Sequence, residues 1–160
     1  MRPLLCVMLC IFLFFTNSSP GCLAGVVRRP TAIGFFAQQL YDFGPFGGPW
    51  THLITWSEVL TNVGNAYNSG YFTAPVDGLY AFHVTLVSQI HGGVGGIADL
   101  MKNNQKFTQV HATQAQFSSG TLSAVMPLQK GDRVSVRLLA LHAIHGNRRS
   151  QFSGFLITEM

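Results

Sequence analysis

The segment GLYAFHVTLVS, residues 78–88, alternates large apolar side chains with smaller or polar ones. Successive side chains of an extended strand point to opposite faces, so this alternation predicts a strand with one apolar face. That face carries Tyr80, Phe82, Val84 and Leu86. His83 falls on the opposite face, where a sheet-surface residue is more common than a metal ligand. No segment sustains a helical period over a full helix, which favours an all-β domain.

Short segments of the same kind recur between turn signals. They are TAIGFFAQQL (31–40), THLITW, EVLTNV, IADLMKN, KFTQVHA and GTLSAVMPL, with HGGVGG (91–96) as a loop. The stretch LQKGDRVSVRLLAL places a Lys-Gly-Asp turn between two apolar runs, which is typical of a hairpin. Roughly ten short strands with frequent turns predict an antiparallel sandwich or jelly roll.

The last predicted strand, FSGFLIT (152–158), is apolar on both faces. Phe152 and Leu156 share one face, while Phe155 and Ile157 share the other. A strand that is apolar on both faces is normally buried on both. In an antiparallel sandwich the second face needs a cover, and we expect a neighbouring subunit to provide it.

Residues 1–24 have the layout of a secretory signal peptide: Arg2, an apolar run over 4–15, and small residues before an expected cleavage after Ala24. The run is shorter than the ~20 residues that a membrane-spanning helix needs. We therefore expect a secreted, extracellular protein with no membrane span and a short arm over residues 25–30. The three cysteines, Cys6, Cys10 and Cys22, all fall within this leader, so no disulfide is expected in the domain.

Charged residues make up 10% of the chain, against a usual ~25%. Setting Arg2 aside leaves nine Lys/Arg against six Asp/Glu, a net charge of +3 that is too small and dispersed to indicate nucleic-acid binding. A domain with few charges and many aromatic residues is poorly suited to a fully solvated surface. Association with identical subunits is one solution.

Residues 56–84 carry a specific spacing: an aromatic, five residues, Asn, four residues, an aromatic, four residues, Phe, five residues and Gly-x-Tyr-x-Phe. The positions are Trp56, Asn62, Tyr67, Phe72, Gly78, Tyr80 and Phe82. This resembles the signature of the C1q-domain family, the globular head of complement component C1q and its relatives. Trp56 stands where Phe is usual, Val84 replaces a final aromatic, and the loop before Phe72 is two residues shorter.

The resemblance extends through later segments, and with them it covers nearly all of residues 31–158. The matching positions there include Gly131, Asp132, Phe152, Gly154 and Phe155. The resemblance implies a C1q domain over residues 31–160. The implied fold is a ten-stranded antiparallel jelly roll, assembled as a trimer as in tumour necrosis factor. Because the sequence has no Gly-x-y run, we expect a head-only secreted member without a collagen stalk.

The segment LHAIHGNRRSQ (141–151) is the strongest candidate for ligand binding. It places His142, His145, Arg148 and Arg149 around a Gly-Asn turn. Arginine pairs bidentately with carboxylates and phosphates, so the loop is interpreted as an anion-recognition site for sialic acid or bacterial envelope anions. The alternative is an ordinary exposed polar loop.

A second candidate is YDFGPFGGPW (41–50), whose Tyr41, Phe43, Phe46 and Trp50 either stack on a ligand or close the end of the sandwich. Some members of the family bind calcium, which needs several oxygen ligands. Asp99 and Asp132 alone do not make such a site, so no cofactor is predicted and calcium stays open. No Gly-x-Ser-x-Gly or phosphate-loop motif is present, and we predict no enzyme.

These observations leave two interpretations of function. The first is a lectin-like homotrimer that binds carbohydrate or anionic microbial surfaces in innate immunity. The alternative is a secreted signalling or cell–cell organising ligand for a protein receptor, as in the adipokine-like and cerebellin-like branches of the superfamily.

Overall fold

The computed structural model describes residues 32–89, 94–115 and 117–160, and within these residues it contains β-strands but no helix. The strands are β1 (Gly34–Gln38), β2 (His52–Leu53), β3 (Glu58–Val63), β4 (Tyr67–Asn68), β5 (Tyr71–Thr73), β6 (Gly78–Val87), β7 (Gly96–Lys102), β8 (Gln105–Ala112), β9 (Ser119–Leu128), β10 (Arg133–Leu138) and β11 (Gln151–Glu159). The expected signal peptide (1–24), the arm (25–30) and residues 91–93 of the loop expected over 91–96 lie outside the described residues.

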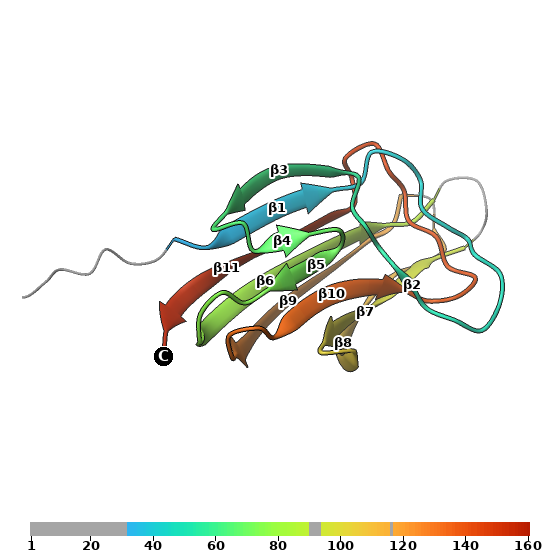
Figure 1. Ribbon diagram of the computed structural model, residues 1–160. Helices are drawn as coiled ribbons and strands as arrows, with labels where there is room; N and C mark the ends of the chain where they lie inside the picture. The colour runs from blue at the N-terminus through green and yellow to red at the C-terminus, as the bar shows by residue number, and fades with distance from the viewer. Residues whose placement is uncertain (1–31, 90–93, 116) are drawn as a thin grey trace, which may run out of the picture. The chain divides into compact units, whose positions relative to one another are not determined.

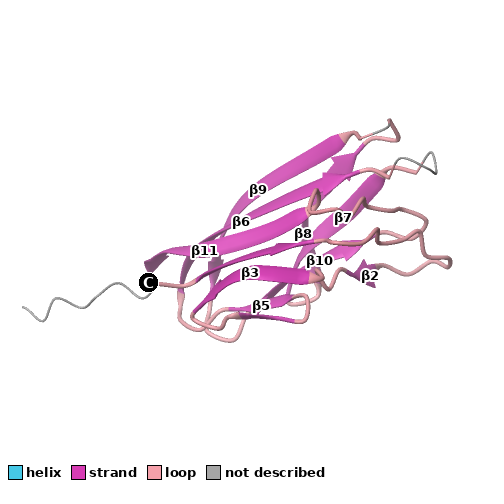
Figure 2. Ribbon diagram, turned by 90° about the horizontal axis from the view of Figure 1, so that it is seen from above, coloured by secondary structure: helices cyan, strands magenta, loops and turns pink. Residues whose placement is uncertain are grey.

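The strands form two antiparallel sheets that pack face to face (Figures 1 and 2). One has five strands in the order β3-β1-β11-β6-β9, and the other has the order β4-β5-β10-β7-β8, with β2 added alongside β10. This all-β antiparallel sandwich confirms the predicted fold class. The described residues hold eleven strands, against about ten predicted from the sequence. Two of the eleven, β2 and β4, are only two residues long.

The centre of the sandwich is filled by aromatic rings from both sheets. Phe35 of β1 stacks on Tyr67 of β4 at 4.5 Å and on Phe72 of β5 at 5.5 Å between ring centroids. Its edge contact with Phe152 of β11 is 4.8 Å, and Phe72 also meets Phe82 of β6 at 5.2 Å. All five rings are almost fully buried. Ring-to-ring packing of this kind stabilises a core beyond the area that it buries.

Polar and small members of the signature support these rings. The Asn62 side-chain amide donates to the Tyr67 carbonyl at 2.8 Å, and its oxygen accepts from the Tyr67 backbone N–H at 3.1 Å. The side chain thereby replaces a pair of backbone ladder bonds at the β3–β4 turn. Gly154 faces inward, where a Cβ would lie 2.5 Å from the Phe82 ring and 2.9 Å from the Phe35 ring. Only glycine lets both rings pack there.

The Lys130-Gly131-Asp132 turn does not form the hairpin that its sequence indicates. β9 belongs to the five-stranded sheet and β10 to the other, so the turn carries the chain from one sheet to the other. Asp132 closes the turn, because its carboxylate accepts from the Gln129 N–H at 3.0 Å while its own N–H donates to the Gln129 carbonyl at 2.9 Å. Gly131 has φ of +93°, a left-handed conformation that glycine adopts without strain. A hairpin joins neighbouring strands of one sheet, whereas this turn forms an arch between two sheets. The same turn sequence suits both, so the pattern alone does not distinguish them.

The outer face of the five-stranded sheet carries an apolar row across its whole width, beside a row that is partly polar. One row of paired residues crosses all five strands: Val63, Gly34, Phe155, Ala81 and Val125. Phe155 is 47% exposed and Val125 55% exposed. The second apolar face that the sequence predicts for β11 is therefore open in the single chain. Exposed apolar side chains gathered in this way on a sheet are typical of an interaction surface.

The central rings should dominate the free energy of unfolding. Replacing Phe82 by Ala is expected to lower it by about 3–5 kcal/mol, because the ring is fully buried between the sheets. Phe107→Ala on β8 is the control, because that ring is 48% exposed. Chemical denaturation of the two variants measures the difference, and equal losses would contradict this account of the core.

Candidate functional site

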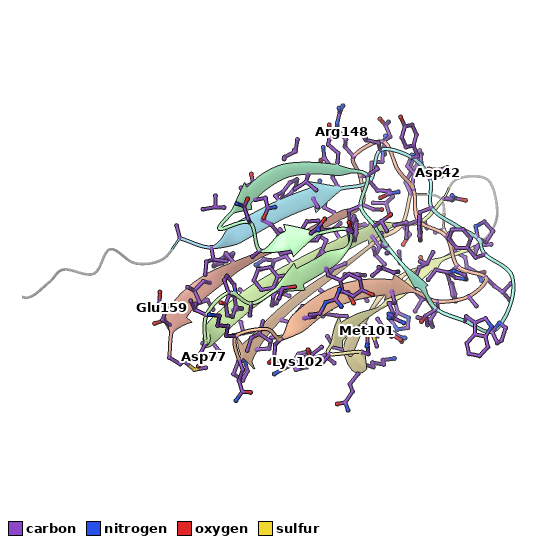
Figure 3. All side chains as sticks on the ribbon, viewed as in Figure 1. Asp42, Asp77, Met101, Lys102, Arg148 and Glu159 are labelled. Carbon is purple, nitrogen blue, oxygen red and sulfur yellow. The ribbon has the colours of Figure 1, made fainter. Side chains whose placement is uncertain are left out.

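Two loops that are far apart in sequence lie together at one end of the sandwich. Residues 39–50 and 139–150 are joined by backbone hydrogen bonds: Phe43 and Ile144 exchange bonds of 3.0 and 2.9 Å, and Leu141 donates to the Phe46 carbonyl at 3.0 Å. Figure 3 places Asp42 and Arg148 at this end, and Asp77 and Glu159 at the other. The two candidate segments therefore form a single surface, which we call the loop end.

The aromatic residues of the 41–50 loop divide between the two roles proposed for them. Phe43 and Phe46 pack together at 4.9 Å between ring centroids and rest against the core, and Phe46 also meets His52 at 4.4 Å. These rings close the end of the sandwich. Tyr41 and Trp50 point outward and are 73% and 74% exposed, so they are available to a ligand or partner.

Arg148 forms an ion pair with the carboxylate of Glu58 on β3. Its Nε donates to Glu58 Oε2 at 3.0 Å and its second nitrogen reaches Oε1 at 3.4 Å, while the Gln38 amide also donates to Glu58. The Arg148 guanidinium, followed by the Gln38 amide, lowers the pKa of Glu58 below its ordinary value of 4.5. The hydrogen bond to Glu58 and the charge of that carboxylate in turn raise the pKa of Arg148. Arg148 thus ties the 139–150 loop to β3.

Arg149 and His145 meet on the ring of Phe117. The Arg149 guanidinium carbon lies 4.7 Å from the centroid of that ring, a cation–π distance, and His145 contacts the ring edge-on at 5.9 Å. Phe117 is 44% exposed. Arg149 makes no ion pair within the described residues, so its guanidinium edge is open to an incoming anion.

His145 is held in a fixed orientation by Asp42. Its Nδ1 lies 2.7 Å from Asp42 Oδ1, which also accepts from the Gly146 N–H at 2.8 Å. A carboxylate only accepts hydrogen bonds, so Nδ1 carries the hydrogen, and the neutral ring keeps a lone pair on Nε2. Gly146 is required here, because a Cβ would come within 2.3 Å of the Tyr41 backbone. This arrangement holds the imidazole ready to accept a hydrogen bond.

His142, the fourth predicted site residue, lies apart from this group. Its Nδ1 donates to the carbonyl of Gly95 at 2.9 Å and fixes the start of β7 to the loop. The structure thus brings His145 and Arg149 together, and assigns Arg148 and His142 to contacts that hold the loop in place. Sequence reasoning did not find Phe117, Asp42 or Glu58, since each meets its partner only through the fold.

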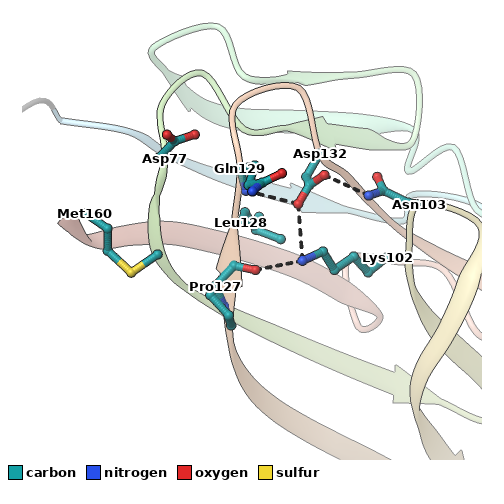
Figure 4. Close-up of a pocket in the computed structure, with 8 residues that line it drawn as sticks. All are labelled: Asp77, Lys102, Asn103, Pro127, Leu128, Gln129, Asp132 and Met160. Carbon is teal, nitrogen blue, oxygen red and sulfur yellow. Dashed lines mark hydrogen bonds and ion pairs between the residues drawn. The ribbon is translucent and has the colours of Figure 1, made fainter.

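A separate pocket of about 580 Å³ lies at the opposite end, below the arch between β9 and β10 (Figure 4). Asp132 and Lys102 line it and form an ion pair at 3.2 Å. The Lys102 ammonium also donates to the Pro127 carbonyl at 2.8 Å, and the Asn103 amide donates to Asp132 Oδ1 at 2.7 Å. Its polar network is therefore largely internal and structural.

The carboxylates considered for calcium are both engaged with cations of the chain. Asp99 accepts from Lys106 at 2.9 Å and from the Gln109 amide at 2.7 Å, and Asp132 is paired as above. In the part of the chain that the structure describes, no three His, Cys, Asp or Glu side chains gather as metal ligands. The same residues include no helix long and apolar enough to cross a membrane.

The network around Asp132 should make stability depend on acid pH. Hydrogen bonds from Asn103 and from the Gln129 N–H, with the Lys102 ammonium, lower the pKa of Asp132 below its ordinary 3.8. The carboxylate therefore stabilises the fold above pH 3.8, and the contribution is lost as pH falls through the lowered value. Asp132→Asn should lower the free energy of unfolding by about 1 kcal/mol at pH 7.

Denaturation of both proteins at pH 7 and at pH 3 or below checks this, with Glu159→Gln as a control at the exposed end of β11. The difference between Asp132→Asn and the unmodified protein should shrink in acid. A difference that is the same at both pH values would contradict it.

Comparison with known proteins finds one matching family and several similar proteins. The C1q domain family matches residues 46–157. Multimerin-2 of Mus musculus is 30% identical over 115 residues, which is 69% of this chain and 12% of that protein. The chain thus spans only about an eighth of the length of that relative.

Solved structures share the fold at low identity. The globular domain of zebrafish complement 1qA superposes with a TM-score of 0.61 at 20% identity, over 82% of this chain and 100% of that chain. The TNF protein Eiger of S. frugiperda gives 0.61 at 14% identity, covering 82% and 96%, and murine APRIL gives 0.60 at 8%, covering 79% and 99%. The predicted resemblance is confirmed: this chain belongs to the C1q-domain family.

Proposed function

We propose that the protein is a secreted, trimeric, lectin-like recognition module that binds anionic glycans at the loop end, and that it is a binding protein and not an enzyme. The observation that carries the proposal is the grouping of Arg149, Phe117 and His145, with one guanidinium free of any carboxylate among the described residues. The secreted location and a role in innate immunity rest on the leader sequence and on the family.

The chemistry of this group fits an acidic sugar. The edge of the Arg149 guanidinium offers two parallel N–H donors that match a carboxylate. His145, oriented by Asp42, offers an acceptor for a sugar hydroxyl. The exposed ring of Tyr41 lies on the adjoining loop and supplies an apolar face for a sugar ring. Sialic acid, with one carboxylate and several hydroxyls, has this combination.

The trimer is supported by the apolar row across the five-stranded sheet. Phe155 on the outer face of β11 and Ile157, at the irregularity that follows it, are each nearly half exposed. Covering such side chains is favourable in proportion to the apolar area removed from water. Three copies would also present three loop ends, so weak contacts with a repeating surface would combine through avidity.

A second candidate function is a ligand for a protein receptor. Its support is the exposed apolar side chains of the loop end: Tyr41, Trp50 and Leu141 are each 65–74% exposed. Aromatic residues at such positions are typical of the centres of protein interfaces. In this case binding would depend on Trp50 and be insensitive to Arg149.

A glycan array with single variants tests the lectin proposal. Arg149→Ala should weaken binding to sialylated glycans about tenfold or more, because a hydrogen-bonded charge pair is lost. Arg148→Ala should have a smaller effect, since that guanidinium already pairs with Glu58. The double variant should resemble Arg149→Ala.

Arg133→Ala is the matched control for general cationic attraction. Arg133 stacks on Tyr71 at 3.7 Å, without a carboxylate partner among the described residues, but it lies on the six-stranded sheet. Equal losses of glycan binding in Arg133→Ala and Arg149→Ala would contradict the proposed binding site at the loop end. No glycan binding together with saturable cell binding that Trp50→Ala abolishes would favour the receptor ligand.

Light scattering tests the trimer. The unmodified protein should have three times the mass of one chain, and Phe155→Glu should reduce it to one chain by placing a charge on the apolar row. Phe107→Glu is the matched control, because Phe107 is equally exposed, at 48% against 47%, but lies on β8 of the other sheet. A single-chain mass for the unmodified protein would refute the proposed assembly.

A further inference from the structure

Among the described residues, His83 is the titratable side chain in the middle of the outer face of the five-stranded sheet. It projects outward from β6, and its neighbours in register are Ser153 on β11 and Ser123 on β9. Its ring stacks on Phe155 at 6.1 Å between centroids, and its Nδ1 lies 2.9 Å from the Ser123 hydroxyl. The histidine is therefore part of the same surface as the apolar row.

The elements around His83 supply no charge to balance a protonated ring. Strands β1, β6, β9 and β11 contain no Asp, Glu, Lys or Arg except Glu159, at the far end of β11 beside Gly78. The other titratable side chain on these strands is Tyr80, whose ring is buried on the inner face. Glu58, the charged residue of β3, is paired with Arg148 of the 139–150 loop at 3.0 Å.

We infer that His83 makes assembly through this face depend on pH, with the neutral imidazole in the assembled protein and the protonated one in separated chains. This rests on the proposed trimer. Burying an imidazolium against an apolar face of a second copy, with no carboxylate beside it, is costly. The neutral ring loses nothing comparable, because its hydrogen bond to Ser123 is made within the chain.

The sign and size of the effect follow from proton linkage. Each protonated chain must release one proton from His83 to assemble, so lowering the pH favours dissociation. Three protons are released for each trimer formed, so the logarithm of the assembly constant should fall by up to about three for each unit by which the pH is lowered in the acid range. At neutral pH and above it should stay constant.

The test is the mass of the purified full chain, measured by analytical ultracentrifugation between pH 5.0 and 8.0 at fixed ionic strength. The unmodified protein should be trimeric at pH 8.0 and dissociate progressively as the pH is lowered toward 5.0. His83→Gln keeps a hydrogen-bonding side chain, and His83→Phe keeps a stacking ring. At least one of them should stay trimeric down to pH 5.0. His111→Gln, at an exposed position on β8 of the other sheet, should retain the full pH dependence.

The outcomes separate this inference from the trimer on which it rests. A single-chain mass at pH 8.0 would overturn the trimer itself. A trimer whose stability does not change between pH 5.0 and 8.0 would overturn the role of His83 and leave the trimer standing. The role of His83 would also be overturned if both His83 variants dissociated with the same dependence on pH as the unmodified protein. Circular dichroism at each pH confirms that the separated chains remain folded.

Discussion

The contact between aromatic rings of the two sheets is the interaction on which the rest of this structure depends. The described residues contain no cysteine, so no disulfide holds the sheets together there. Phe35 instead contacts rings from β4, β5 and β11, and Gly154 leaves the space that Phe82 and Phe35 need. Because these contacts lie between the sheets, they fix the framework without using any residue of the loop end. The loops are then free to carry other chemistry.

The strands and the inward face could be predicted from local pattern, because alternation in a strand directly reflects which side is buried. Tyr80, Phe82 and Phe152 follow from it in this way. The assignment of strands to sheets could not. The Lys130-Gly131-Asp132 turn joins the two sheets, and its residues satisfy the same local geometry that a hairpin would require. Which strand lies beside which is decided by packing over the whole chain.

The candidate site shows a second limit of local pattern. The sequence points to the 141–151 segment, but the meaning of each cation depends on a partner far away. Glu58, 90 residues from Arg148, turns that arginine into a structural contact, and Asp42, 103 residues from His145, orients the imidazole. Phe117 sits in a polar segment with no motif, yet it gathers His145 and Arg149. Such partners become visible only when the topology brings the loops together.

Scarcity of charge gives the two surfaces their different characters. Strands β1, β6, β9 and β11 carry almost no ionised groups, so in the proposed assembly little charge would oppose burial against another copy, and a single histidine would be enough to change that balance. At the loop end, Glu58 neutralises Arg148 and a hydrogen bond to Asp42 orients His145, which leaves the Arg149 guanidinium without an ion pair among the described residues. In a chain rich in charge neither effect would stand out, since exposed pairs and screening would dilute both. Low charge is thus the physical condition for the proposed associating face and the proposed recognition site at the loop end.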